Sequence, residues 1–146
     1  MTLYGPNETS LGSLTVAGWV DGVTISAQGN LGKLTVGGLR SATLQAGGVA
    51  TNVAGNHRAV GEVTVQGIKD ALLASVVNSN IAVWSLGKIT LTGVNTPNGG
   101  TAFGLGGHTL ANYTRGTVHC VNQVGALTLD NVEDYAVRLV YWADGV

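Results

Sequence analysis

The sequence predicts an all-β fold, specifically a parallel β-helix (β-solenoid) of about five coils. Three observations lead to this prediction. A unit of eleven residues occurs five times, and its copies align with one another without gaps. Each unit alternates apolar and polar residues with a period of two. The chain has 23 glycines but only 2 prolines in 146 residues. This composition is typical of short strands separated by tight corners. We expect residues 1–146 to form a single domain, either as a whole protein or as a fragment of a longer repeat protein.

The five copies of the unit begin at residues 11, 31, 60, 86 and 124. They are LGSLTVAGWVD, LGKLTVGGLRS, VGEVTVQGIKD, LGKITLTGVNT and VGALTLDNVED. A stacked coil needs the same residue type at the same place in every turn, so it explains these matches. An antiparallel β-sandwich, which is the alternative fold, does not require them.

The apolar–Thr–apolar triplet in each unit is expected to be a strand with its apolar side chains facing inward. The threonines would then form a ladder on an outer face: Thr15, Thr35, Thr64, Thr90 and Thr128. One such row is typical of strand packing, whereas an ice-binding face usually needs two.

The eighth position of the unit predicts a structural corner. Its residues are Gly18, Gly38, Gly67, Gly93 and Asn131. Because Asn is the residue that best tolerates a left-handed backbone after Gly, we expect a positive φ angle here.

A second strand is expected after each corner. The clearest segments are VTISA from Val23, ATLQA from Ala42 and ALLAS from Ala71. The fourth and fifth equivalents, TAFGL from Thr101 and VRLVY from Val137, match less closely.

The extra residues in the longer units predict a ridge of loops at one corner. The insertions lie at about Val49–Ala59, Val76–Trp84 and Gly106–Gln123. Insertions at one register of a coil emerge one above another, and such faces often bind ligands. The candidate interaction ridge comprises His57, Arg58, Trp84, His108, Tyr113, Arg115 and His119.

Several kinds of site have no support in the sequence. His119 and Cys120 are adjacent and therefore point to opposite sides of an extended chain, so we expect no metal site. Cys120 is the single cysteine and is expected to be a small buried residue. The acidic residues Asp21, Asp70 and Asp134 share one repeat position as turn formers, and we expect no catalytic residues and no cofactor.

Charge and hydropathy exclude other partners. Charged residues make up 10% of the chain, the net charge is −1, and no block of Lys and Arg occurs. We therefore expect neither nucleic-acid binding nor membrane insertion. The first ten residues lack the features of a signal peptide, so any secretion signal is expected to lie outside this chain.

The alternation of LGKLTVGG with TISAQGN resembles the β-helical repeat regions of large secreted or surface proteins of planctomycetes and related environmental bacteria. The resemblance covers residues 11–96 and part of 124–140. It implies an extracellular or cell-surface location and a structural or adhesive role, and it supplies no catalytic residues.

These observations together predict a non-enzymatic structural or interaction module. Because a solenoid leaves open strand edges at its ends, we expect self-association into a homo-oligomer or filament through those ends. The alternative is a carbohydrate-binding or carbohydrate-processing β-helix that binds a glycan on the loop ridge.

Overall fold

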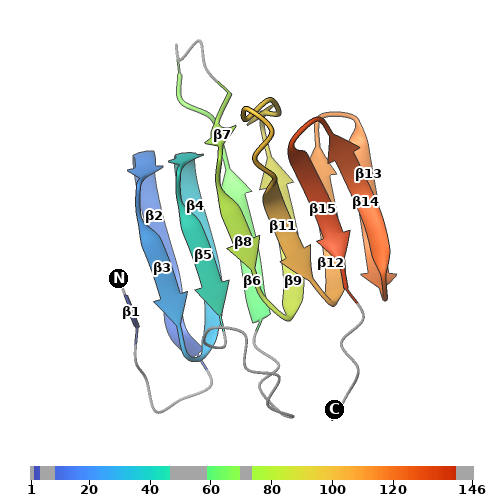
Figure 1. The fold of residues 1–146 in the computed structure, drawn as a ribbon. Coiled ribbons are helices and arrows are strands. Elements are labelled where there is room, and N and C mark those ends of the chain that lie inside the picture. The colour runs from blue at the N-terminus through green and yellow to red at the C-terminus, as the bar shows by residue number, and fades with distance from the viewer. Residues whose placement is uncertain (1, 4–8, 47–58, 70–73, 141–146) are drawn as a thin grey trace.

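The protein is built from two β-sheets that face each other (Figure 1). The computed structural model describes residues 2–3, 9–46, 59–69 and 74–140, and all regular structure in these ranges is β-strand. Most neighbouring strands in both sheets are parallel. The prediction of an all-β fold is therefore confirmed.

The main strands of each sheet follow chain order from β2 or β1 at one end, except that β14 lies outside β15 at the other end and that the short strands β7 and β10 lie beside β4. In the described ranges, the seven-stranded sheet contains β1 (Thr2–Leu3), β3 (Thr24–Ala27), β5 (Thr43–Ala46), β8 (Asn80–Ala82), β11 (Phe103–Gly107), β15 (Tyr135–Leu139) and β14 (Leu127–Val132). The eight-stranded sheet contains β10 (Val94–Asn95), β7 (Val76–Val77), β2 (Thr9–Asp21), β4 (Asn30–Arg40), β6 (Ala59–Val65), β9 (Ser85–Leu91), β12 (Thr109–Arg115) and β13 (Val118–Val124).

The first four copies of the repeat lie one above another in the eight-stranded sheet. Leu14 pairs with Leu34, Leu34 with Val63, and Val63 with Ile89. The predicted threonine ladder follows the same register from Thr15 to Thr90. The predicted in-register stacking is thus confirmed for these four copies.

The glycine at the second position of the repeat is required by the close approach of successive strands. A Cβ atom on Gly32 would lie 2.1 Å from the carbonyl oxygen of Gly12, and one on Gly61 would lie 2.6 Å from that of Gly32. On Gly87 it would lie 1.9 Å from the oxygen of Gly61. No side chain larger than hydrogen fits at these three positions without moving the backbone.

The fifth copy of the repeat does not stack on the fourth, so that prediction is wrong. Its first residue, Val124, ends β13 and pairs antiparallel with Thr109, and most of the rest forms β14 in the other sheet. The reason is a chain reversal after β12, at a turn where Gly116 has a φ of 56°. Residues 110–115, with the sequence LANYTR, take the fifth place, and Thr114 rather than Thr128 pairs with Thr90.

The predicted left-handed corner is also wrong at four of its five positions. Of those positions only Gly67 has a positive φ, of 87°; Gly18, Gly38, Gly93 and Asn131 do not. Gly38 has a different reason for being glycine, because a Cβ there would lie 2.5 Å from the ring of Trp19.

Left-handed residues occur a few positions later, where the chain leaves the eight-stranded sheet. They are Gly22, Ser41 and Asn78, with φ angles of 63°, 47° and 41°. The amide of Gly22 donates to the carbonyl of Arg40, and the amide of Ser41 to that of Val77, so these positions follow one another from turn to turn. In these turns the left-handed residue is therefore a turn former (Gly, Ser or Asn) that comes after the repeat glycine.

The second strands of the repeat form the seven-stranded sheet, with one correction. The strands expected near Val23, Ala42, Thr101 and Val137 are β3, β5, β11 and β15. The third is β8 rather than the segment from Ala71: Ile81 pairs with Leu44, Ala74 and Ser75 are not in a strand, and residues 71–73 lie outside the described ranges.

The interior between the sheets is apolar. Inward side chains of the eight-stranded sheet, such as Val63 and Ile89, are fully buried and form one core cluster with Ile81, Leu105 and Val137 from the other sheet. Burying such a side chain contributes about 1.5–3 kcal/mol. The fold is therefore held by repeated apolar contacts between the sheets and by the parallel strand ladders within them.

Candidate functional site

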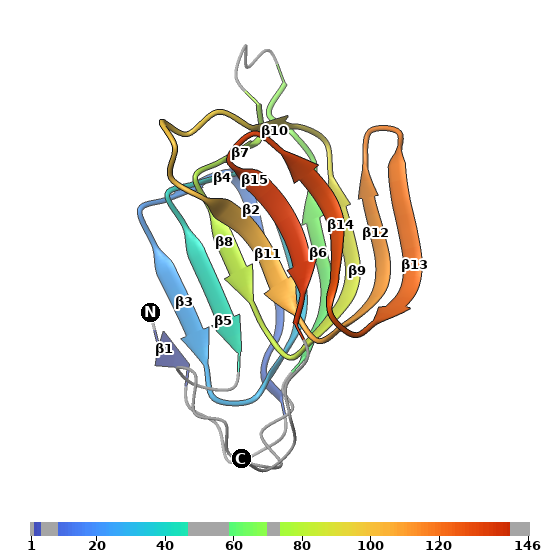
Figure 2. The ribbon, with the colours of Figure 1, turned by 45° about the vertical axis from the view of Figure 1, so that its right-hand side comes forward.

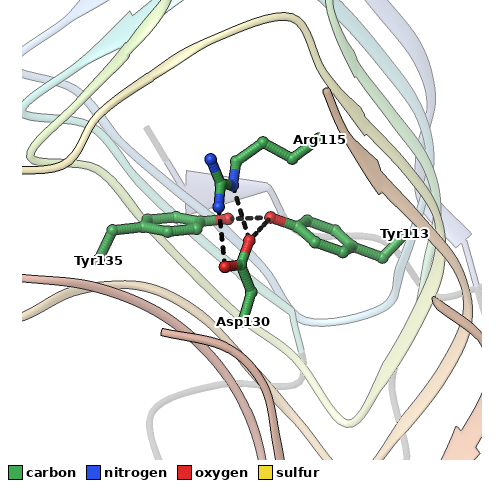
Figure 3. Close-up of polar contacts among 4 residues, drawn as sticks. All are labelled: Tyr113, Arg115, Asp130 and Tyr135. Atoms are coloured by element: carbon green, nitrogen blue, oxygen red, sulfur yellow. Dashed lines mark hydrogen bonds and ion pairs between the residues drawn. The ribbon is translucent and has the colours of Figure 1, made fainter. Parts of the chain in front are cut away.

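The most unusual chemistry in the described residues is a buried polar cluster at the end of the stack formed by β12–β15. It consists of Tyr113, Arg115, Asp130 and Tyr135, whose polar groups converge between the two sheets (Figure 3). We call these four residues the C-terminal cluster.

Two members of the cluster occupy inward positions of the repeat. In β12, Tyr113 pairs with Ile89 and Arg115 with Leu91, both of which are buried core residues in β9. The alternation of the strand therefore directs Tyr113 and Arg115 into the space between the sheets, where earlier turns hold aliphatic side chains.

The other two members come from the opposite sheet. Asp130 lies on β14 directly after an irregularity in the pairing of β14 with β15, and such bulges often redirect a side chain. Tyr135 begins β15, pairs with Phe103 of β11, and packs its ring 5.4 Å from the Phe103 ring.

The hydrogen bonds within the cluster are short and complete. Arg115 donates from Nε to Asp130 Oδ2 at 2.6 Å and from Nη2 to Asp130 Oδ1 at 2.8 Å, which forms a bidentate pair. The Tyr113 hydroxyl donates to Asp130 Oδ2 at 2.7 Å and lies 2.9 Å from the Tyr135 hydroxyl. The Arg115 guanidinium also lies 5.7 Å from the centre of the Tyr135 ring.

The cluster is shielded from water. The side chain of Asp130 is 4% exposed and that of Arg115 is 20% exposed, while Tyr113 and Tyr135 are fully buried. Charges in such a place are tolerated because each is paired and hydrogen-bonded.

This environment fixes the protonation state of each group. Burial alone would raise the pKa of Asp130, but the hydrogen bonds from Arg115 and Tyr113 outweigh it and hold that pKa below its usual value. Burial, together with the neighbouring Tyr135 and Asp130, raises the pKa of Tyr113 far above its usual value. Burial likewise raises the pKa of Tyr135. At neutral pH the cluster holds an ionised Asp130 and two protonated tyrosines.

The polar groups of the cluster bond to one another. Both oxygens of Asp130 accept hydrogen bonds, and the tyrosine hydroxyls are bonded to each other. The cluster ends the apolar interior with a satisfied polar layer at the last turn.

The residues of the predicted interaction ridge do not share one surface. Tyr113 and Arg115 point into the interior, whereas His119 is exposed and pairs with Thr114, whose side chain faces outward. Trp84 and His108 stack with ring centres 4.5 Å apart, and His108 Nδ1 lies 3.0 Å from the carbonyl oxygen of Val140. His57 and Arg58 lie outside the described residues.

The prediction that the insertions form stacked loops is wrong for two of the three segments. Val76–Trp84 contains β7 and β8, and Val76, Ile81 and Val83 are buried. Gly106–Gln123 contains β12 and nearly all of β13, which complete the eight-stranded sheet. These segments became strands because they supply the apolar residues that continue the core. Most of the first segment, Val49–Ala59, lies outside the described residues.

Sequence reasoning missed Asp130 and Tyr135 as partners of Arg115. A signal was present: LANYTR repeats the pattern apolar–small–any–apolar–Thr, with Arg at an inward position. A charged residue at an inward position requires a buried partner of opposite charge. Cys120, which was expected to be buried, pairs with Tyr113 across β12 and β13 and is only half-buried against the core.

Two further searches of the described residues gave no candidate. Within the ranges that the structure describes, no group of three or more His, Cys, Asp or Glu side chains is placed to hold a metal ion. The same ranges contain no helix that is long and apolar enough to cross a membrane.

Comparison with known proteins found no match to a protein-family model, a curated protein or a solved structure.

Proposed function

We propose that the chain is a non-enzymatic structural module, a β-solenoid that associates with other copies of itself through an open end. The single observation that supports this most strongly is that the apolar core continues to the surface at β2, the first long strand of the stack.

The path of the chain supports the solenoid. From β2 to β6 and again from β8 to β9, successive strands alternate between the two sheets, and each strand lies parallel to its equivalent in the next turn. The parallel pairs continue through β11 and β12 (Figure 2). A chain that coils between two sheets in this way forms a stack whose end strands have free edges.

Three core positions of the repeat are only partly buried in β2: Leu11, Leu14 and Val16. The residues that pair with them in β4 are buried: Leu31, Leu34 and Val36. The difference arises because β4 has a neighbouring turn on each side, whereas β2 pairs with β4 along one edge and, in the described part of the chain, with no strand along the other.

The free edge of β2 has only part of the usual protection against pairing, namely two shifts in its register with β4, between Thr9 and Leu11 and between Val16 and Trp19. Natural edge strands are commonly short, charged or interrupted by proline. β2 has 13 residues and no charged residue or proline before Asp21 at its end. An uncharged free edge next to partly exposed core residues favours the addition of another strand.

The experiment that tests this proposal is sedimentation velocity over a hundred-fold range of protein concentration. We expect the weight-average mass to rise with concentration above that of one chain, and salt to have little effect because the end is uncharged. A constant mass of one chain over the whole range would contradict the proposal.

The extracellular or cell-surface location implied by the resemblance remains part of the proposal, and localisation of a tagged chain in its native cell would test it. We do not extend the proposal to a glycan-binding ridge, because the described residues of that ridge lie on different faces.

A further inference from the structure

We infer that the partner at β2 is a second copy of this chain, bound through the same strand by two-fold antiparallel pairing centred on Thr15. The inference rests on the proposed self-association and specifies its geometry: two copies meet head to head and form a closed dimer rather than a filament.

The two ends of the stack differ, and the C-terminal end is the protected one. Both sheets finish there in an antiparallel strand, β13 in one and β14 in the other, and Gly125 and Ala126 connect them across the end. Both strands are irregular: β14 has a register shift between Thr128 and Asp130, and Asn122 in β13 has a φ of 50°. Irregular edges of this kind hinder further pairing. The C-terminal cluster seals the interior beneath them. β2 also shifts register, between Thr9 and Leu11 and between Val16 and Trp19, but it pairs regularly from Leu11 to Val16, the stretch that contains Thr15.

The free edge of β2 is instead complementary to itself. A two-fold axis at Thr15 places Leu14 opposite Val16 of the other copy, and Ser13 opposite Ala17. Residues directly opposite in an antiparallel pair share one face of the sheet. The half-buried Leu14 and Val16 would therefore continue the core across the axis, while the exposed Thr15 residues would meet on the outer face.

Gly12 and Gly18 lie three residues on either side of the axis, and Gly18 falls where β2 shifts register against β4, between Val16 and Trp19. In the next turn, a Cβ on Gly32 or Gly37 would collide with the backbone of β2, at 2.1 and 2.4 Å. Around a Cβ built on Gly12 or Gly18, no heavy atom of the described residues lies within 4 Å. Glycine in a strand costs roughly 0.5–1 kcal/mol relative to alanine. The open space beside Gly12 and Gly18 leaves room for a backbone that approaches from outside.

Charge does not oppose this arrangement. The one charged residue of β2, Asp21, lies six residues from the axis and already pairs with Arg40 at 2.5 Å. In a two-fold interface, a residue near the axis lies close to the same residue of the other copy. A charged side chain near Thr15 would therefore be repelled by its counterpart. From Thr9 to Val20 the strand has none.

The test is a cysteine at the axis. In a Cys120→Ala background, which removes the single native cysteine, Thr15→Cys places two sulfurs on opposing residues. Opposing Cα atoms in an antiparallel pair are about 4.5–5.5 Å apart, within the range that a disulfide spans. We expect a covalent dimer under mild oxidation. The matched control is Thr90→Cys, which lies in the same outer row three turns away and should not cross-link.

A charge at the axis gives an independent measurement on the non-covalent protein. Thr15→Lys should weaken dimerisation at least ten-fold in sedimentation equilibrium, because two ammonium groups would face each other, whereas Thr90→Lys should leave it unchanged. Circular dichroism and the melting temperature at low concentration verify that each variant is folded.

The outcomes separate this inference from the proposed function. Cross-linking of Thr15→Cys, with association that stops at two copies, supports both. Association that continues beyond two copies, or cross-linking of Thr15→Cys to a Val121→Cys chain instead of to itself, would overturn the head-to-head dimer and leave self-association intact. A monomer at every concentration, without cross-linking, would overturn both.

Discussion

Arg115 occupies a position that the preceding turn fills with Leu91, so the last turn has exchanged an apolar core residue for a charge. The exchange is tolerated because Asp130 supplies a bidentate partner from the opposite sheet. The contribution of this ion pair to stability therefore depends on the presence of both charges, because either charge alone would be buried without a partner of opposite sign.

We predict that Arg115→Leu destabilises the protein by about 3 kcal/mol, because it leaves the carboxylate of Asp130 buried without its cation. The double variant Arg115→Leu/Asp130→Leu should recover most of this loss, since an apolar pair can replace a buried ion pair. Urea unfolding of the three proteins measures the difference. A suitable control is Lys33→Leu, whose exposed pair with Glu62 at 3.4 Å should contribute much less. Equal losses for the single and double variants would contradict this account.

The two tyrosines of the cluster predict a loss of stability at alkaline pH. Their pKa values are raised in the folded protein above the ordinary value near 10, mainly by burial. A raised pKa means that the folded state retains the proton, so this contribution is complete below about pH 10 and is lost as the pH rises above it. Absorbance at 295 nm should show that Tyr113 and Tyr135 ionise only when the protein unfolds. Ionisation of all four tyrosines near pH 10 in the folded state would be inconsistent with the buried cluster.

At the scale of the strand, the spacing between turns depends on the glycine at the second position of the repeat. This requirement is a backbone contact between neighbouring turns, and the dihedral angles of the three contacting glycines are not positive. It accounts for the glycine in the stacked turns from β4 to β9. The equivalent position in β12 is Ala111, so the last of these turns accommodates a Cβ beside Gly87.

We predict that Gly87→Ala costs roughly 1–3 kcal/mol, because its Cβ would lie 1.9 Å from the carbonyl oxygen of Gly61 and the two strands would have to separate. The matched control is Gly106→Ala in β11, where no heavy atom of the described residues lies within 4 Å of the new Cβ. That substitution should be neutral or slightly stabilising. Denaturant unfolding of both variants tests the prediction, and similar effects at the two positions would exclude backbone contact as the cause.

The sequence predicted strands well where the repeat was regular and failed where chain direction changed. The period-two pattern and the shared glycine placed the first four turns in register. The pattern of Val124–Asp134 matched the repeat equally well, yet a short turn at Gly116 had already reversed the chain, and a local pattern contains no information about strand direction. The C-terminal cluster was missed for a related reason: the partners Arg115 and Asp130 are joined only when β14 crosses to the opposite sheet.

At the scale of the whole molecule, the stack has a polarity. One end closes with antiparallel strands and a buried polar layer, and the other presents an uncharged strand beside partly exposed core residues. An assembly that uses only one end closes at two copies, whereas one that uses both ends grows without limit.

This polarity predicts a concentration-dependent pattern of hydrogen exchange. In a monomer, amides on the free edge of β2 have no strand to bond with among the described residues and should exchange quickly, as should those on the outer edge of β13. As the concentration rises, the head-to-head dimer protects β2 alone, because the same strand of the second copy accepts its hydrogen bonds. β13 is the internal comparison, since it also ends the eight-stranded sheet but lies at the opposite end of the stack. Mass-spectrometric exchange should show slower labelling in peptides from residues 9–21 and unchanged labelling in peptides from residues 118–124. Equal protection of both strands would instead indicate head-to-tail growth, in which β13 of one copy pairs with β2 of the next.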